Sequence, residues 1–98
     1  MYVSVHHTIT DPQKWDQTTK NIMAMTEHGR LPNGVKGLMY LPGVDGRRAD
    51  CLWETNSLDV LKSFLERETG AAAKNEYFQI RDNAAFGLPG HEAVRKAA

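Results

Sequence analysis

Residues 35–54 read VKGLMYLPGVDGRRADCLWE. Two largely apolar segments, residues 35–41 and 48–54, flank a turn that contains both a Pro-Gly and an Asp-Gly dipeptide. Turn residues of this kind between two strand-like segments are typical of a β-hairpin. The centre of the fold is therefore predicted to be an antiparallel pair of strands.

A strand and a helix are predicted upstream of this hairpin. Residues 2–9, YVSVHHTI, alternate in a period of two and are rich in β-branched side chains, as in a strand. Asp11 and Pro12 are typical of the N-cap and the first position of a helix. Gly29 is a typical residue just past a helix end. The segment between is therefore predicted to be helical.

A second helix and a fourth strand are predicted downstream. Ser57 is placed to cap the helix, Gly70 lies just past its end, and residues 75–81, NEYFQIR, resemble a strand. The resulting order is β-α-β-β-α-β. With right-handed crossovers this order predicts an α+β fold, the ferredoxin-like βαββαβ sandwich, with a four-stranded antiparallel sheet and two helices on one face. Another α+β arrangement of the same elements is the alternative.

Composition restricts the kind of protein. The 98 residues correspond to one domain, and the 12 basic and 12 acidic residues cancel without forming a basic cluster. This argues against nucleic acid and anionic membrane as partners, because binding to phosphates requires a concentrated positive surface. No segment approaches the ~18 apolar residues of a membrane span, so a cytoplasmic protein is expected. Cys51 is the single cysteine, which excludes an intramolecular disulfide.

The sheet face away from the helices is predicted to pair with a second copy of the chain. Alternation assigns four sets of residues to the helices: Val3/Val5/Ile9, Val35/Met39/Leu41, Ala49/Cys51/Trp53 and Phe78/Ile80. The opposite sets are Tyr2/Ser4/His6/Thr8, Lys36/Leu38/Tyr40, Asp50/Leu52/Glu54 and Tyr77/Gln79/Arg81. The opposite sets mix large and ionisable side chains, which favours a polar-studded cavity enclosed by two sheets in a homodimer. Residues 1–83 are predicted to form this domain, and residues 84–98 a C-terminal tail that packs on the partner subunit.

The chain resembles a known superfamily. Val5-His6 in the first predicted strand and the segment GRRADCLWETNSLDVLKSFLERETG, followed by NEYFQI, resemble the dimeric α/β-barrel proteins of ferredoxin-like fold. Within that superfamily the chain is most similar to small proteins typified by a nickel-binding member. The resemblance implies the fold and dimerisation, and it matches His6 to a strand-one metal ligand. The second predicted strand here, GLMYL, contains no histidine.

The two adjacent histidines are predicted to have different roles. Successive strand residues point to opposite faces, so His6 is expected in the inter-sheet cavity and His7 among the core residues under the helices. The predicted ligand-binding residues are His6, Tyr40, Asp50, Glu54 and Tyr77. Of these, His6 is the best candidate for a metal ligand or a base, and a carboxylate beside it could orient its imidazole.

Three other patterns are assigned structural roles. Cys51 lies in the helix-facing set and is expected to be a small core residue. The Gly43-x-x-Gly46 pair lacks the lysine of a phosphate-binding loop and is predicted to be a hairpin turn. His91-Glu92 begins an HExxH pattern, but residue 95 is Arg, so the zinc-protease motif is incomplete.

Two classes of function follow, and a purely structural dimer without a ligand is the third alternative. The first is a small homodimeric binding protein that holds a small ligand or a divalent metal such as nickel in the inter-sheet cavity. The second is a cofactor-independent monooxygenase or isomerase that acts on a small aromatic or polyketide-like substrate, with His6 as base or orienting group. The sequence requires no cofactor for either. Catalysis needs a positioned acid or base, and His6 is the candidate that the pattern offers.

Overall fold

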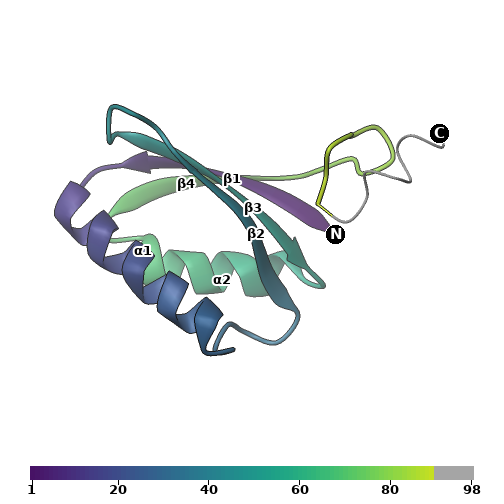
Figure 1. The fold of residues 1–98 in the computed structure, drawn as a ribbon, viewed down its shortest axis with the longest axis horizontal. Coiled ribbons are helices and arrows are strands. Elements are labelled where there is room, and N and C mark those ends of the chain that lie inside the picture. The colour runs from purple at the N-terminus through teal and green to yellow at the C-terminus, as the bar shows by residue number, and fades with distance from the viewer. Residues whose placement is uncertain (90–98) are drawn as a thin grey trace.

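A computed structural model describes residues 1–89 of the chain (Figure 1). Its elements follow the predicted order: β1 (Tyr2–Ile9), α1 (Pro12–Glu27), β2 (Val35–Pro42), β3 (Arg48–Thr55), α2 (Leu58–Thr69) and β4 (Ala73–Gln79). This confirms the ferredoxin-like βαββαβ fold. The incomplete HExxH pattern lies outside the described residues, as does most of the predicted tail. The predicted boundary between residues 1–83 and 84–98 stays a prediction.

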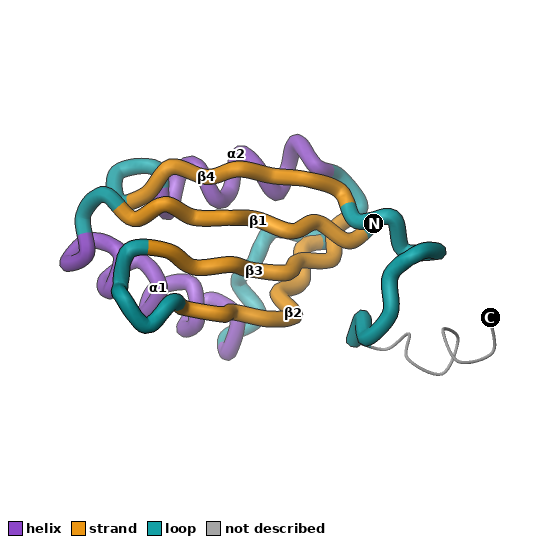
Figure 2. Tube along the Cα trace, turned by 90° about the horizontal axis from the view of Figure 1, so that it is seen from above, coloured by secondary structure: helices purple, strands orange, loops and turns teal. Residues whose placement is uncertain are grey.

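All strand pairs are antiparallel, in the order β2-β3-β1-β4. Both helices lie on the same side of the sheet (Figure 1). Seen from above, α2 lies toward the β4 edge and α1 toward the β2 edge (Figure 2). Within residues 1–89 no helix covers the other face of the sheet, and we call it the open face. The sheet therefore offers two different surfaces for a site.

Both helices begin at the residues expected from the sequence. The Asp11 side chain accepts a hydrogen bond from the backbone N–H of Lys14, and the Ser57 hydroxyl accepts one from Val60. These bonds satisfy backbone donors that the first helical turn would otherwise leave unpaired. Gly29 follows α1 with a φ of 65°, a left-handed conformation that glycine adopts without strain. Local sequence therefore determines where the helices start and stop.

The main core lies between α2 and the central strands. Leu61, Phe64 and Leu65 of α2 are almost completely buried and form one cluster with Val3 and Val5 of β1. Burial of each such side chain contributes roughly 1.5–3 kcal/mol relative to exposure. Val35 and Trp53 complete the cluster, whereas Ile22 and Met25 of α1 pack against it and are only partly buried, so the α1 side of the sheet is less tightly filled.

An irregularity in β2 overturns part of the predicted face assignment. Gly37 pairs with Trp53, and Met39 pairs with the adjacent residue Leu52. Leu38 between them is therefore an extra residue in β2, which is the pattern of a β-bulge. Beyond the bulge Tyr40 pairs with Cys51 on the helix-facing side, and Leu41 pairs with Asp50 on the open face. The predicted positions of Tyr40 on the open face and Leu41 toward the helices were therefore wrong, because the inserted residue reverses the alternation.

The faces of β4 are also reversed relative to the prediction. Tyr77 pairs with buried Val5 and faces the helices, whereas Phe78 pairs with Ser4 and is 58 % exposed. A one-residue difference in register moves every side chain of a strand to the other face. Tyr77 and Phe78 are both aromatic, so hydrophobicity alone did not distinguish the two registers.

Candidate functional site

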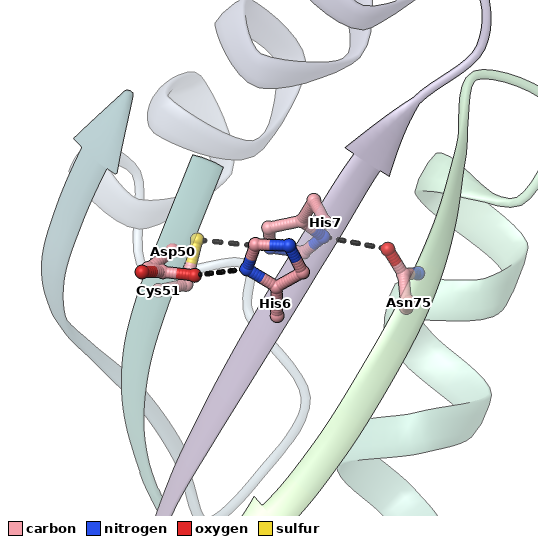
Figure 3. Close-up of polar contacts among 5 residues, drawn as sticks. All are labelled: His6, His7, Asp50, Cys51 and Asn75. Atoms are coloured by element: carbon pink, nitrogen blue, oxygen red, sulfur yellow. Dashed lines mark hydrogen bonds and ion pairs between the residues drawn. The ribbon is translucent and has the colours of Figure 1, made fainter. Parts of the chain in front are cut away.

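His6 lies on the open face, next to an acidic residue as predicted. It pairs across β3 with Asp50 and across β4 with Glu76, so both carboxylates flank it on the same face. The His6 Nδ1 lies 2.6 Å from Asp50 Oδ1 (Figure 3). Because a histidine nitrogen bonded to a carboxylate holds the imidazole in one orientation, Asp50 orients His6.

The other predicted ligand-binding residues lie elsewhere. Glu54 pairs with Tyr2 near the opposite end of β3, away from His6. Tyr40 and Tyr77 face the helices, on the other side of the sheet. Within residues 1–89 no group of three or more potential metal ligands is brought together. A nickel ion or other divalent metal at His6 stays a prediction.

The helix-covered side contains a cavity of about 240 Å³ between α1 and the sheet. Its lining comes from α1, the three strands β1, β2 and β3, and the end of α2. The residues are His7, Trp15, Thr19, Ile22, Met23, Thr26, Gly37, Leu38, Met39, Tyr40, Cys51, Trp53, Leu65 and Thr69. Among the described residues, none that lines the cavity is an aspartate, glutamate, lysine or arginine. The cavity is therefore suited to an uncharged ligand, since an unpaired charge there would lose its hydration without compensation.

One wall of the cavity depends on a glycine. A Cβ atom at Gly37 would lie 3.3 Å from the Trp53 ring, closer than ordinary van der Waals contact. Glycine at this position of β2 lets the Trp53 ring lie against the strand backbone. The bulge and this glycine together shape the β2 side of the cavity.

Trp15 and Tyr40 form a polar contact at the cavity. The Trp15 Nε1–H donates a hydrogen bond to the Tyr40 hydroxyl oxygen at 3.0 Å. Partial burial raises the pKa of Tyr40, so its hydroxyl keeps its proton at neutral pH. The phenol accepts from Trp15 through its oxygen, and its own O–H can donate to a ligand.

His7 is a buried member of the cavity wall. Its Nδ1 lies 2.6 Å from Asn75 Oδ1, and its Nε2 lies 3.1 Å from Cys51 Sγ (Figure 3). Its ring also packs on Trp15, with the ring centroids 4.8 Å apart. The prediction that His7 is a packed, hydrogen-bonded histidine under the helices agrees with this geometry. His7 also lines the cavity, which the sequence did not indicate.

The hydrogen bonds around Asn75 determine which His7 nitrogen carries the proton. The Asn75 Nδ2 donates to Glu66 Oε2 and to Thr69 Oγ1, both at 2.8 Å. The Thr69 hydroxyl in turn donates to the Leu65 carbonyl oxygen, so its oxygen is free to accept from Asn75. The amide oxygen of Asn75 therefore faces His7, and the His7 Nδ1–H donates to it. The Nε2 lone pair is left as the acceptor.

The Cys51–His7 pair is neutral at rest. Burial lowers the pKa of His7, against the opposing effect of its bond to Asn75, so the imidazole is uncharged at neutral pH. Burial raises the pKa of the Cys51 thiol to about 12. The thiol S–H consequently donates to the His7 Nε2, and the pair holds one transferable proton on sulfur.

Asn75 and the cavity itself were not predicted from the sequence. Asn75 was placed at the start of the last predicted strand, whereas β4 begins at Ala73 and Ala73 pairs with Ile9. An asparagine at an inward position of a strand is a signal for a buried polar partner. Whether Asn75 is at an inward position depends on the register of β4, and only the pairing of β4 with β1 fixes that register.

The fold is similar to those of two solved structures. A putative antibiotic biosynthesis monooxygenase from Nitrosomonas europaea matches with a TM-score of 0.50 and 11% sequence identity, over 83% of this chain and 99% of that one. The protein Rv0793 from Mycobacterium tuberculosis matches with a TM-score of 0.53 and 12% identity, over 86% of this chain and 98% of that one. At this identity the similarity establishes the fold alone.

No protein-family model matches the sequence, and no curated protein matches it. Neither helix in residues 1–89 combines the length and the apolar character that a bilayer crossing requires.

Proposed function

We propose that this protein binds a small, uncharged aromatic molecule in the cavity between α1 and the sheet. The observation that carries the proposal is the cavity lining, which in the part of the chain that the structure describes has aromatic and aliphatic walls, a few polar groups and no charged side chain. Ligand sites typically combine an apolar lining with a small number of placed polar groups. The predicted small-molecule ligand is thereby assigned to the helix-covered face rather than to an inter-sheet cavity.

The cavity volume limits the ligand to about one or two fused rings. A cavity of roughly 150 Å³ lined by apolar side chains accommodates benzene, and pockets for drug-sized ligands begin near ~300 Å³. The cavity of about 240 Å³ falls between the two. Within it, the Tyr40 hydroxyl supplies a donor for a ligand carbonyl or phenol oxygen.

Calorimetric titration with 1-naphthol and 1-naphthoate tests the proposal. The two compounds have the same ring system and differ in charge, so we expect binding of the naphthol and none of the naphthoate. A Thr19→Phe variant places a ring in the cavity and should weaken naphthol binding by at least about tenfold, or ~1.4 kcal/mol. Lys20→Phe, at the next and exposed position of α1, is the matched control and should bind like the wild type. Equal binding by both variants would contradict the proposed location.

We further propose that the open face pairs with a second copy of the chain. The neighbouring strands place Leu52 and Phe78 on this face, on either side of Ser4, and Leu41 beside Asp50. Phe78 and Leu41 are more than half exposed in the single chain. An uncovered row of large apolar side chains on a sheet face supports an interface between copies.

Sedimentation velocity tests the homodimer. The wild type should sediment as a dimer, and Phe78→Glu should shift it to the monomer because a charge in each copy would be buried without a partner. Lys20→Glu, on the helix side, is the control and should leave the dimer intact. A monomeric wild type at micromolar concentration would refute this part of the proposal.

A cofactor-independent monooxygenase or isomerase is the second candidate. Its specific support is the neutral His7 imidazole in the cavity wall, whose Nε2 the Asn75 bonds hold as an acceptor. At rest this nitrogen accepts from the Cys51 thiol, so a substrate proton would replace that hydrogen bond. A base in this position can remove a proton from a phenol or an activated C–H, and the electron-rich anion can then react with oxygen or rearrange. The proposed base is therefore His7, in place of the predicted His6.

Oxygen consumption with a panel of hydroxynaphthalenes tests this second candidate. Turnover should be lost in His7→Gln and kept in His6→Gln, because the two side chains lie on opposite faces of β1. Turnover that depends on His6 would contradict the assignment, and binding without turnover would leave the protein as a binding module.

A further inference from the structure

The cavity wall holds a cysteine, a histidine and an asparagine joined by two hydrogen bonds. Cys51 Sγ lies 3.1 Å from His7 Nε2, and His7 Nδ1 lies 2.6 Å from Asn75 Oδ1 (Figure 3). A nucleophile within hydrogen-bond reach of a base, with the base oriented by a third group, is the arrangement that activates serine and cysteine nucleophiles. The proposed binding of an aromatic ligand makes no use of the thiol.

The three residues come from three adjacent strands of the sheet, which holds them rigidly. His7 of β1 pairs directly with Asn75 of β4, and Cys51 lies on β3, the other neighbour of β1. Sites built on strands hold their geometry better than sites built on loops. Cys51 and His7 both line the cavity, so a bound ligand lies within reach of the thiol.

We propose that Cys51 is a nucleophile that adds covalently to small, uncharged α,β-unsaturated carbonyl compounds, quinones included, with His7 as general base and Asn75 as positioning residue. This inference names a ligand class for the cavity, and in that respect it rests on the proposed function. Thiols add readily to polarised carbon–carbon double bonds, and the uncharged aromatic lining suits a flat, neutral molecule of this class.

The addition balances without a further reactant. The His7 Nε2 accepts the proton of the Cys51 thiol as the sulfur attacks the β-carbon of the ligand. A carbon–sulfur bond forms, the carbon–carbon π bond breaks, and its electron pair moves onto the carbonyl oxygen as an enolate. The imidazolium then returns the proton to the enolate, so that the net change is addition of S–H across the double bond.

Trp53 supplies a donor for the oxygen that becomes negative. Its indole Nε1–H is buried and makes no hydrogen bond of ordinary geometry within the described residues, and its side chain lines the same cavity. The indole lies beside the Cys51 sulfur, where it lowers the pKa of the thiol against the effect of burial. A buried donor without a partner costs free energy unless a ligand satisfies it. A hydrogen bond to the developing enolate oxygen would both satisfy this group and stabilise the charge that forms there.

Because Cys51 and His7 are both neutral at rest, the thiol proton must pass to His7 as the sulfur attacks the ligand. The raised pKa of Cys51, due mainly to burial and partly offset by the Trp53 side chain, keeps the sulfur protonated. The lowered pKa of His7 keeps its Nε2 available as a base above about pH 6.5. The pair therefore differs from a preformed thiolate–imidazolium pair, and this difference can be measured.

The pH dependence of labelling by 1,4-naphthoquinone tests the inference in the wild-type protein. Intact-mass spectrometry follows the adduct, and because the chain has a single cysteine, its loss in Cys51→Ser assigns it to the thiol rather than to a lysine amine. With His7 as base, the labelling rate should be level between pH 7 and 8.5. A rate that rises about tenfold per pH unit would indicate a simple buried thiol of high pKa and would overturn the proposal.

Variants test the roles of the three residues. Cys51→Ser should give no adduct, and His7→Gln should label roughly 10²-fold more slowly, as expected for loss of a general base. Asn75→Ala, which leaves the imidazole in place but unoriented, should slow labelling by less. Equal rates in folded wild type and folded His7→Gln would overturn the proposal. If His7→Gln does not fold, the wild-type pH profile decides alone.

Titration of the wild type with 1-naphthol separates this inference from the proposed function, because 1-naphthol has the ring system of the quinone but no electrophilic carbon for the thiol to attack. Naphthol binding without quinone labelling of the wild type would refute the thiol centre and leave the binding site standing. Labelling that depends on His7, in a protein that does not bind naphthol, would refute the proposed binding of aromatic molecules and leave the thiol centre standing.

Discussion

Acidification should destabilise the protein through His7. Only 1 % of the surface of this residue is exposed, and burial lowers its pKa below the ordinary value of 6.5, with the bond to Asn75 acting in the opposite direction. The unfolded chain therefore binds a proton at His7 more readily than the folded protein does. Its contribution to stability is fully present above pH 6.5 and is lost as the pH falls below that value.

The size of the effect follows from proton linkage. One proton taken up on unfolding changes the free energy of unfolding by up to about 1.4 kcal/mol per pH unit. Between pH 7.5 and pH 5 the limit for His7 alone is about 2 kcal/mol, reached if the folded protein keeps the imidazole neutral throughout. For a small domain this corresponds to a decrease of about 1 M in the urea midpoint.

Urea denaturation followed by circular dichroism, at constant protein concentration, measures the effect. The wild type and His6→Gln should both lose stability between pH 7.5 and pH 5, because both proteins keep the buried His7. His7→Gln should show a clearly smaller decrease, although its stability at pH 7.5 will differ from that of the wild type. If all three proteins show parallel curves, His7 is not buried in its neutral form and the reasoning fails.

Three further substitutions test the packing and the local hydrogen bonds. Leu61→Ala should lower the free energy of unfolding by about 2–5 kcal/mol, because this side chain is completely buried in the core under α2. The control is Val60→Ala, at the neighbouring exposed position, which should change the free energy of unfolding by less than about 1 kcal/mol. Chemical denaturation measures both variants. Tyr40→Phe removes the hydroxyl that accepts a hydrogen bond from the buried Trp15 N–H, and it should lower the free energy of unfolding by about 1–3 kcal/mol. Because the Trp15 indole loses its partner, tryptophan emission should change as well. Ser57→Ala removes the N-cap of α2 and should cost about 1 kcal/mol in the same denaturation assay, while a cost near zero would mean that the cap is dispensable.

The order of the elements and the separation of the two histidines could be predicted from the sequence. The caps at Asp11 and Ser57, the hairpin between residues 42 and 48, and the alternation of β1 are local patterns that hold in the structure. The alternation also assigned His6 and His7 to opposite faces, and placed Asp50 on the same face as His6. These predictions depend only on neighbouring residues and on the period of a strand.

In β2 and β4, tertiary structure decided which side chains face the helices. Alternation relates residues within one strand, but a bulge such as that at Leu38 appears only when β2 is paired with β3, and it moved Tyr40 to the helix side. In β4 both candidate faces carried an aromatic side chain, and pairing with β1 selected Tyr77 and Asn75 as the inward residues. The sequence alone therefore specified a ferredoxin-like sheet with His6 and Asp50 on one face. The cavity, and the hydrogen bonds that connect His7 to residues distant in the chain, exist only because strand register brings those residues together.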